Sequence, residues 1–229
     1  MAGTAASASR PPLAGSEPLF RISLAQRSLF QATFGAVVLG FERGDLRRFV
    51  EELAAGTRTL VGKAAPSDLA KVARREFGLG AVEYVNWFYF HRAGDLGYFK
   101  GMASIADGEG VTSLLMMCGM EGNLGAPGKS ARTQAIENHT KWLEPAKILG
   151  CHSTRVTARS DSSLVPEEQQ RLVADGLRAL CELADDFGLN VLVENHGGIE
   201  DTASSMRAAD TEPSASMRAF ERQERYWSE

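Results

Sequence analysis

The sequence predicts an α/β fold with about five parallel strands, each joined to the next by a helix. Its near-continuous apolar runs are typical of strands that are covered on both faces. A helix-like segment also ends repeatedly at a glycine that is followed at once by such a run, at Gly78, Gly110, Gly150 and Gly188. Successive glycines lie 32, 40 and 38 residues apart. A strand, a crossover helix and the next parallel strand need about 30 residues or more, so the spacing indicates consecutive βα units.

The N-terminal part contributes one strand and one helix to this pattern. Residues 19–26 are predicted to form the first strand, and a helix is predicted over 67–77, with Ser67 as its cap. Between them, residues 35–64 do not follow the βα rhythm, and we interpret them as an insertion. Within the insertion, residues 45–54 have the pattern of a short amphipathic helix.

The later part is more regular. A helix is predicted over 166–187, because Pro166 suits a first turn and Gly188 suits a C-terminal stop. The strands that follow the four glycines end near Glu83, Cys118, Thr157 and Glu194. Another helix is predicted over 131–149, with an apolar face made of Ile136, Trp142, Leu143, Ala146 and Leu149.

Composition narrows the class of protein. The 229 residues suffice for one large domain, and the apolar fraction of 44% is ordinary for a globular protein. The net charge is −4, so no general basic field exists and we expect no nucleic-acid partner. Cys118, Cys151 and Cys181 show no CxxC spacing and lie in apolar stretches. They are predicted to be buried free thiols in a reducing compartment.

Targeting signals are not found in the sequence. Residues 1–18 are rich in Ala, Ser, Pro and Gly and lack the apolar core of a secretory signal, so we expect a disordered tail. No apolar run approaches the roughly 18 residues of a membrane span. The chain is therefore predicted to be cytoplasmic and to have no membrane partner.

Polar residues gather where the predicted strands end. In parallel α/β folds, functional sites form beyond the carboxyl ends of the strands. The residues that follow or close these strands are therefore the candidates for chemistry. They are Glu83, Asn86, Glu121, Arg155, Glu194 and His196.

Glu194 is the strongest of these candidates, because it ends a strand whose preceding residues are apolar. A buried carboxylate is costly unless a cation meets it. In one interpretation this cation is a divalent metal, and in a second it is the side chain of Arg155. In a third, the carboxylate is simply hydrated. The sequence leaves all three open. His196, two residues on, is a candidate second ligand, acid/base or substrate donor. Glu83 is either a second interior carboxylate or part of a rim salt bridge, and Glu121 lies on a loop where we expect it to be solvated.

Several segments together resemble the sugar phosphate isomerase/epimerase family, the xylose isomerase-like TIM barrels. They are "RISLAQRSLF", "VEYVN", "LLMMCGMEGNLG", "AIENHTKWLEPAKILGCHSTRV" and "DGLRALCELADDFGLNVLVENHGG". The resemblance implies a (βα)₈-type barrel and a small sugar or sugar phosphate as substrate. It also implies a divalent metal ion (Mn, Mg, Co or Zn) held by Glu194. Glu194 and His196 would be catalytic, and Asn86, Glu83, Glu121 and Arg155 would bind the substrate.

The resemblance implies proton transfer between sugar carbons through an enediolate, as in isomerases and epimerases. The family takes its other metal ligands from later strands, whereas residues 199–229 are polar and predicted to be a frayed helix or disordered. We therefore expect a partial, C-terminally truncated barrel over 19–198. Two alternatives remain open. One is a non-catalytic binding module that another chain, such as a second copy in a homo-oligomer, completes. The other is an endonuclease IV-like phosphodiesterase.

Overall fold

The protein was studied as a computed structural model. The predicted tail 1–18, the segment 199–229 and His196 lie outside the part of the chain that the structure describes, as does most of the insertion 35–64. The described residues are 22–34, 48–49, 51–53, 55–57 and 62–194.

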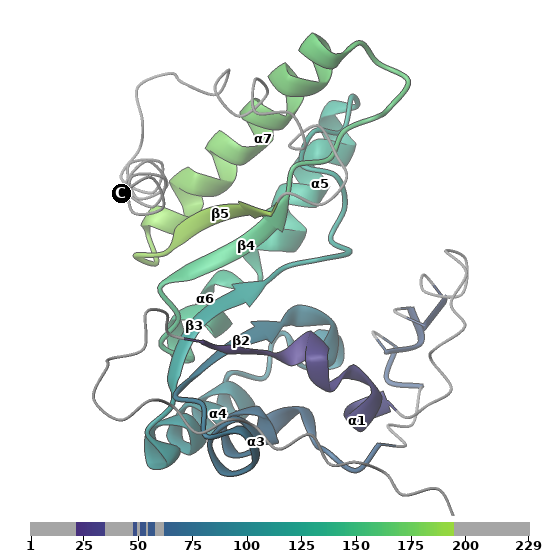
Figure 1. The fold of residues 1–229 in the computed structure, drawn as a ribbon. Coiled ribbons are helices and arrows are strands. Elements are labelled where there is room, and N and C mark those ends of the chain that lie inside the picture. The colour runs from purple at the N-terminus through teal and green to yellow at the C-terminus, as the bar shows by residue number, and fades with distance from the viewer. Residues whose placement is uncertain (1–21, 35–47, 50, 54, 58–61, 195–229) are drawn as a thin grey trace, which may run out of the picture.

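Five parallel strands form one sheet, in the same order in the sheet as in the sequence (Figure 1). The predicted number of strands and their parallel direction are therefore confirmed. The first strand is shorter than the predicted range 19–26, of which 19–21 are not described. The strands are β1 (Leu24–Ala25), β2 (Ala81–Val85), β3 (Thr112–Met117), β4 (Ser153–Thr157) and β5 (Asn190–Glu194).

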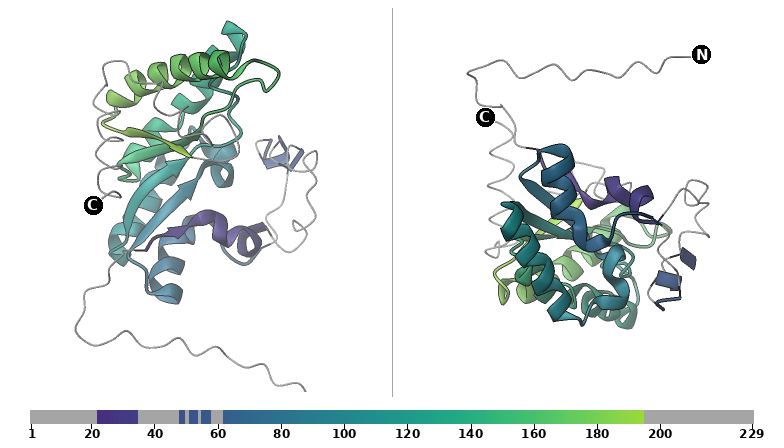
Figure 2. Two further views of the ribbon diagram at one scale, coloured as in Figure 1. Left: turned by 45° about the horizontal axis from the view of Figure 1, so that its top comes forward. Right: turned by 90° about the horizontal axis from the view of Figure 1, so that it is seen from below.

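Helices precede each of the later strands and pack on one side of the sheet (Figures 1 and 2). Helix α3 contacts β2, α4 contacts β3, α6 contacts β4, and α7 contacts β5, while α5 packs on α7. The α-helices are α1 (Phe30–Phe34), α3 (Leu69–Phe77), α4 (Leu96–Glu109), α5 (Lys129–Thr140), α6 (Leu143–Ile148) and α7 (Pro166–Asp185), and the 3₁₀ helices are η1 (Gln26–Leu29), η3 (Pro66–Asp68) and η4 (Asn86–Arg92).

Two of the four junction glycines cap helices as predicted, Gly78 after α3 and Gly110 after α4. Gly150 and Gly188 lie two and three residues beyond the ends of α6 and α7. All four have positive φ, between 63° and 79°. This left-handed conformation is strained for residues with a Cβ, which is why glycine occupies these turns. In contrast, the predicted Ser67 cap is wrong. Ser67 lies inside η3, and Asp68 precedes α3 without a capping hydrogen bond from its side chain.

The helix predicted over 131–149 is two helices instead of one. Helix α5 ends at Thr140, and α6 begins at Leu143. Pro145 explains the break, because its ring would clash with the carbonyl group of Lys141 in a continuous helix, and it has no N–H to donate to that carbonyl. In the first turn of α6 the same proline is tolerated, since N–H groups there have no partner within the helix.

The sheet has two chemically different faces. Val82, Met116, Val156 and Val191 are buried in the hydrophobic core that the helices cover. Successive side chains of a strand point to opposite faces, so their neighbours in the sequence point to the other side. We call that side the inner face; it carries Glu83, Met117, Arg155, Leu192 and Glu194.

Two smaller expectations can be compared with the structure. Cys118, Cys151 and Cys181 are buried, as predicted. Burial raises the pKa of the Cys118 and Cys151 thiols to about 12. Within the described ranges, no helix combines the length and the apolar character that crossing a membrane requires.

Candidate functional site

Three of the predicted residues meet on the inner face as a charged trio, which we define as Glu83, Arg155 and Glu194. One guanidinium nitrogen of Arg155 (Nη1) lies 3.9 Å from Oε2 of Glu83. The other (Nη2) lies 3.5 Å from Oε1 of Glu194. Ser23 donates a hydrogen bond to Oε1 of Glu83 at 2.7 Å. The trio therefore places one cation between two carboxylates.

The strand register brings the trio together. Arg155 of β4 is level with Met117 of β3, which is level with Val85 of β2, two residues after Glu83. On the other side, Thr157 is level with Glu194, two residues beyond Arg155. Because side chains two residues apart share a face, Arg155 can reach toward β2 and β5 together. The inner face is thus charged at its centre although the strands are largely apolar.

The guanidinium of Arg155 is only partly engaged. Its ion-pair distances exceed those of ordinary charge-assisted hydrogen bonds, which are about 2.7–2.9 Å. Nη2 also lies 3.1 Å from the sulfur of Met117. Nε is buried and has no hydrogen-bond partner among the described residues. The trio side chains are 27%, 22% and 23% exposed for Arg155, Glu83 and Glu194, so a small solute can approach them.

The trio bears directly on the alternatives that the sequence left open. For Glu194, the carboxylate pairs with Arg155, which was one of three interpretations. For Glu83, the carboxylate is both on the inner face and in a salt bridge with Arg155. Across the described part of the chain, no group of three or more His, Cys, Asp or Glu side chains is placed to hold a metal ion.

Asn86 and Glu121 form a second, separate cluster, the buried network. Asn86 Nδ2 donates to the carbonyl oxygen of Gly119 at 3.0 Å and to Oε1 of Glu121 at 3.1 Å. The amide of Gly119 donates back to Oδ1 of Asn86 at 3.0 Å. Asn86 therefore joins the segment after β2 to the segment after β3. Both polar atoms of its side-chain amide form hydrogen bonds within the protein.

Glu121 is buried, which contradicts the expectation that its carboxylate is solvated. Besides Asn86, the indole N–H of Trp142 donates to Oε1 at 2.5 Å, and Lys141 Nζ donates to Oε2 at 2.8 Å. A buried carboxylate is stable when charge and hydrogen bonds compensate for its desolvation. Sequence reasoning assigned Trp142 only to an apolar face and did not consider Lys141, because no local pattern links residues about 20 positions apart.

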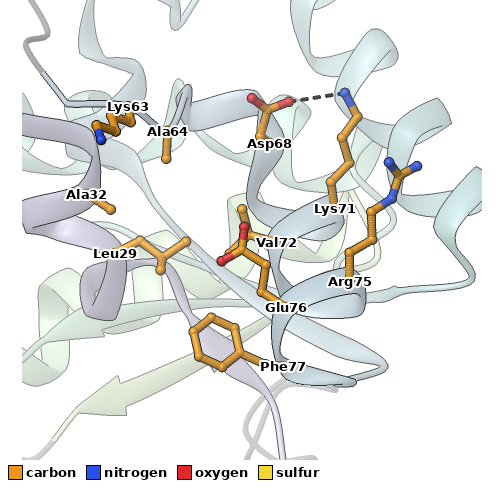
Figure 3. A pocket seen from close by; sticks show the side chains of 10 residues that line it. All are labelled: Leu29, Ala32, Lys63, Ala64, Asp68, Lys71, Val72, Arg75, Glu76 and Phe77. Carbon is orange, nitrogen blue, oxygen red and sulfur yellow. Dashed lines mark hydrogen bonds and ion pairs between the residues drawn. The ribbon is translucent and has the colours of Figure 1, made fainter. Parts of the chain in front are cut away.

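A surface cleft of about 570 Å³ lies elsewhere on the molecule (Figure 3). It is lined by residues of η1, α1 and α3 and by Lys63 and Ala64. Lys71 pairs with Asp68 across its edge, and Arg75 pairs with Glu109 of α4. None of the predicted site residues lines this cleft, so we do not assign the site to it.

Comparisons with known proteins identify the fold. The sequence profile of the xylose isomerase-like TIM barrel family matches residues 71–215. No curated protein sequence matches the chain. The α/β fold with parallel strands is thus a partial barrel of this type, as the sequence predicts.

Two solved structures are similar in backbone. One is 3-keto-D-glucoside 4-epimerase from E. coli, with a TM-score of 0.52, 15% identity, and coverage of 66% of this chain and 60% of that chain. The other is a D-tagatose 3-epimerase-like protein, with a TM-score of 0.54, 18% identity, and coverage of 67% and 58%. This chain therefore spans less than two thirds of the length of either structure.

Proposed function

The chain belongs to the xylose isomerase-like TIM barrel family, and from this premise we propose that it is a sugar isomerase or epimerase-type protein. Its substrate would be a small sugar or sugar phosphate with a carbonyl group. The names of the two structural neighbours, both epimerase-related, support this class of reaction. The observation that carries the proposal in this chain is the charged trio on the inner face.

The trio has the groups that proton transfer beside a carbonyl requires. A carboxylate base removes the proton, and a positioned cation or hydrogen-bond donor stabilises the oxyanion that develops. Glu194 is the proposed base. Arg155 is the proposed electrophile, because its side chain is 27% exposed and its two terminal nitrogens contact the carboxylates only at 3.9 and 3.5 Å. The two ion pairs place Glu194 and Glu83 around the same guanidinium.

We propose the following sequence of steps. The Glu194 carboxylate takes the proton from the carbon next to the carbonyl group, and the electron pair moves onto the carbonyl oxygen. Arg155 stabilises the resulting enediolate by hydrogen bonding. Return of the proton to the former carbonyl carbon, with transfer of the hydroxyl proton to the former carbonyl oxygen, gives isomerisation. Return of a proton to the opposite face of the original carbon gives epimerisation. For epimerisation, Glu83 is the proposed acid, and it must take up a proton from solvent before the step; it contacts the other side of the same guanidinium.

The family resemblance also implies a divalent metal at Glu194, and the described residues do not fit that group by themselves. Within the trio, only the carboxylates of Glu83 and Glu194 offer oxygen ligands. No set of three potential ligands is formed within the described ranges. The guanidinium of Arg155 lies 3.5 Å from Oε1 of Glu194, where it would repel a metal ion. No step is therefore assigned to a metal, and His196 lies outside the described residues.

Deuterium exchange tests this proposal. The protein is incubated in D₂O with D-tagatose or a 3-keto-D-glucoside, and NMR follows the proton on the carbon next to the carbonyl. We expect solvent deuterium to replace this proton. Glu194→Gln should slow the exchange by about 10²-fold or more, the usual contribution of a general base. Glu168→Gln, at an exposed carboxylate of α7 that pairs with Arg171, should leave the exchange unchanged. Equal exchange in the wild type and Glu194→Gln would remove Glu194 from the mechanism.

A second candidate function is a binding module without catalysis. It is favoured by β5, whose only strand partner among the described residues is β4. Sugar binding without any deuterium exchange would support it. The endonuclease-like alternative requires a cluster of metal-binding histidines, and no observation on the described residues favours it.

A further inference from the structure

Arg155 differs from Arg171, another arginine that lies between two carboxylates. On the surface of α7, Arg171 pairs with Glu168 at 2.8 Å and with Asp175 at 3.3 Å. Those partners are on the same helix, and the three side chains are 40% to 59% exposed. The partners of Arg155 instead come from two other strands and are about three-quarters buried. Solvent therefore screens the charges of the trio less than those around Arg171.

We propose that Arg155 is the built-in counter-ion of Glu83 and Glu194, and that a divalent cation can reach Glu194 only when the guanidinium moves away. This inference rests on the proposed function, because it concerns the same site. Besides its proposed contact with the substrate, Arg155 then determines which cation the two carboxylates hold. The positive charge that the family resemblance assigns to a metal is supplied here by a side chain.

Charge arithmetic supports this assignment. The trio carries two negative charges and one positive charge, so its net charge is −1. Without the guanidinium the net charge of the trio becomes −2, which favours the binding of another cation. The guanidinium has N–H donors and no acceptor atom, so Arg155 cannot become a metal ligand and must either stay or move. Its ion pairs of 3.5 and 3.9 Å are loose enough to permit movement.

Manganese titration of the full chain, without any sugar, tests the inference. Calorimetry would compare the wild type with Arg155→Met and with Arg155→Lys, which keeps the charge. We expect Arg155→Met to bind Mn²⁺ at least about tenfold more tightly, because a like charge about 4 Å from the cation has been removed. Arg155→Lys should bind as weakly as the wild type. The gain should disappear in Arg155→Met/Glu194→Gln.

Arg171→Met is the matched control, since it also removes an arginine that lies between two carboxylates. It should leave the Mn²⁺ affinity unchanged. The inference is overturned if Arg155→Met binds Mn²⁺ no more tightly than the wild type, or if Arg171→Met gains as much affinity. Because no sugar is present, these results are independent of the deuterium-exchange experiment, which alone decides the proposed function.

A charge-compensation variant covers the case in which Arg155→Met does not fold. If Arg155 is the counter-ion of the two carboxylates, removing their charges should restore the stability that Arg155→Met loses. The triple variant Glu83→Gln/Arg155→Met/Glu194→Gln removes all three charges. Thermal unfolding would then show a higher Tm for the triple variant than for Arg155→Met. If the triple variant is as unstable as the single one, Arg155 acts through packing alone and the inference is wrong.

Discussion

At the scale of single residues, the carboxylate of Glu121 shows what a buried charge needs in this protein. It accepts hydrogen bonds from Asn86, at the start of η4, and from Lys141 and Trp142, which lie between α5 and α6. Glu121→Ala would leave the buried indole N–H without its acceptor and the side chain of Asn86 with one partner fewer. We expect a loss of about 3–5 kcal/mol in the free energy of unfolding, as when one partner of a buried ion pair is removed. Guanidinium denaturation measures this loss.

Two further variants separate the contributions to this loss. Glu121→Gln keeps the size and one acceptor for Trp142 but removes the charge, so it should cost less than Glu121→Ala. Glu168→Ala removes an exposed carboxylate that pairs with Arg171, and its effect should be far smaller. If Glu121→Ala is no more destabilising than Glu168→Ala, the buried network does not stabilise the fold.

His139 provides a pH-dependent contribution at the same scale. Burial lowers the pKa of its imidazole from the ordinary 6.5, and its Nδ1 lies 2.7 Å from the carbonyl oxygen of Ala135. The unfolded chain therefore binds a proton at this residue more readily than the folded chain. Its contribution to stability is complete above about pH 6.5 and decreases as the pH falls through the lower pKa of the folded state.

Thermal unfolding between pH 8 and pH 5 tests this expectation. The Tm of the wild type should fall more steeply toward acid than the Tm of His139→Asn, which lacks the titrating group. His91 has a pKa that burial also lowers, so part of the slope should persist in the variant. NMR titration of the His139 ring measures its pKa directly, and a value at or above 6.5 would refute the expectation.

At the scale of elements, α7 depends on a glycine that no turn requires. Gly176 lies within α7, and a Cβ at this position would approach the carbonyl oxygen of Leu124 to 2.0 Å. Backbone atoms cannot yield as a side chain can. We therefore expect Gly176→Ala to lower the free energy of unfolding by about 1–3 kcal/mol, because overpacking outweighs the better helix propensity of alanine.

Gly101 is the matched control for Gly176. It also lies within a helix, α4, but a Cβ there would meet nothing within 4 Å. Gly101→Ala should raise the free energy of unfolding by about 1 kcal/mol through helix propensity alone. Chemical denaturation of the two variants gives both values. Equal changes of the same sign would show that α7 and the loop around Leu124 can move apart freely.

The elements were largely predictable because their signals are local. A glycine with positive φ follows each helix at the junctions, and an apolar run forms each strand. Helix ends and strands could therefore be predicted from neighbouring residues. Pro145 is also a local signal, and considering it would have divided the helix predicted over 131–149. The Ser67 cap was wrong because the segment from Pro66 to Asp68 turns as a 3₁₀ helix first.

The candidate site was less predictable because its contacts are non-local. Glu83, Arg155 and Glu194 could be named from their places near the strand ends. Which of them pair depends on the register of four strands, and no local pattern encodes that register. The same holds for Glu121, whose loop position suggested solvent, whereas its donors Lys141 and Trp142 follow a helix that bends back over it.

At the scale of the whole molecule, the order of the strands predicts a gradient of stability across the sheet. Strand β3 is paired on both sides, by β2 and β4, and β5 has β4 as its only strand partner within the described ranges. Amides exchange with solvent through local opening, which is easier at an edge than at the centre of a sheet. We expect the amides of β5 to exchange at least about tenfold faster than those of β3.

Hydrogen–deuterium exchange followed by mass spectrometry measures this gradient, and two protein concentrations make it informative about assembly. If a second copy covers the edge, exchange in β5 should slow as the concentration rises, while exchange in β3 stays constant. This is the behaviour expected of a homo-oligomer, because mass action populates the paired state. Protection of β5 equal to that of β3 at every concentration would contradict the gradient, since the edge would then be covered within a single chain.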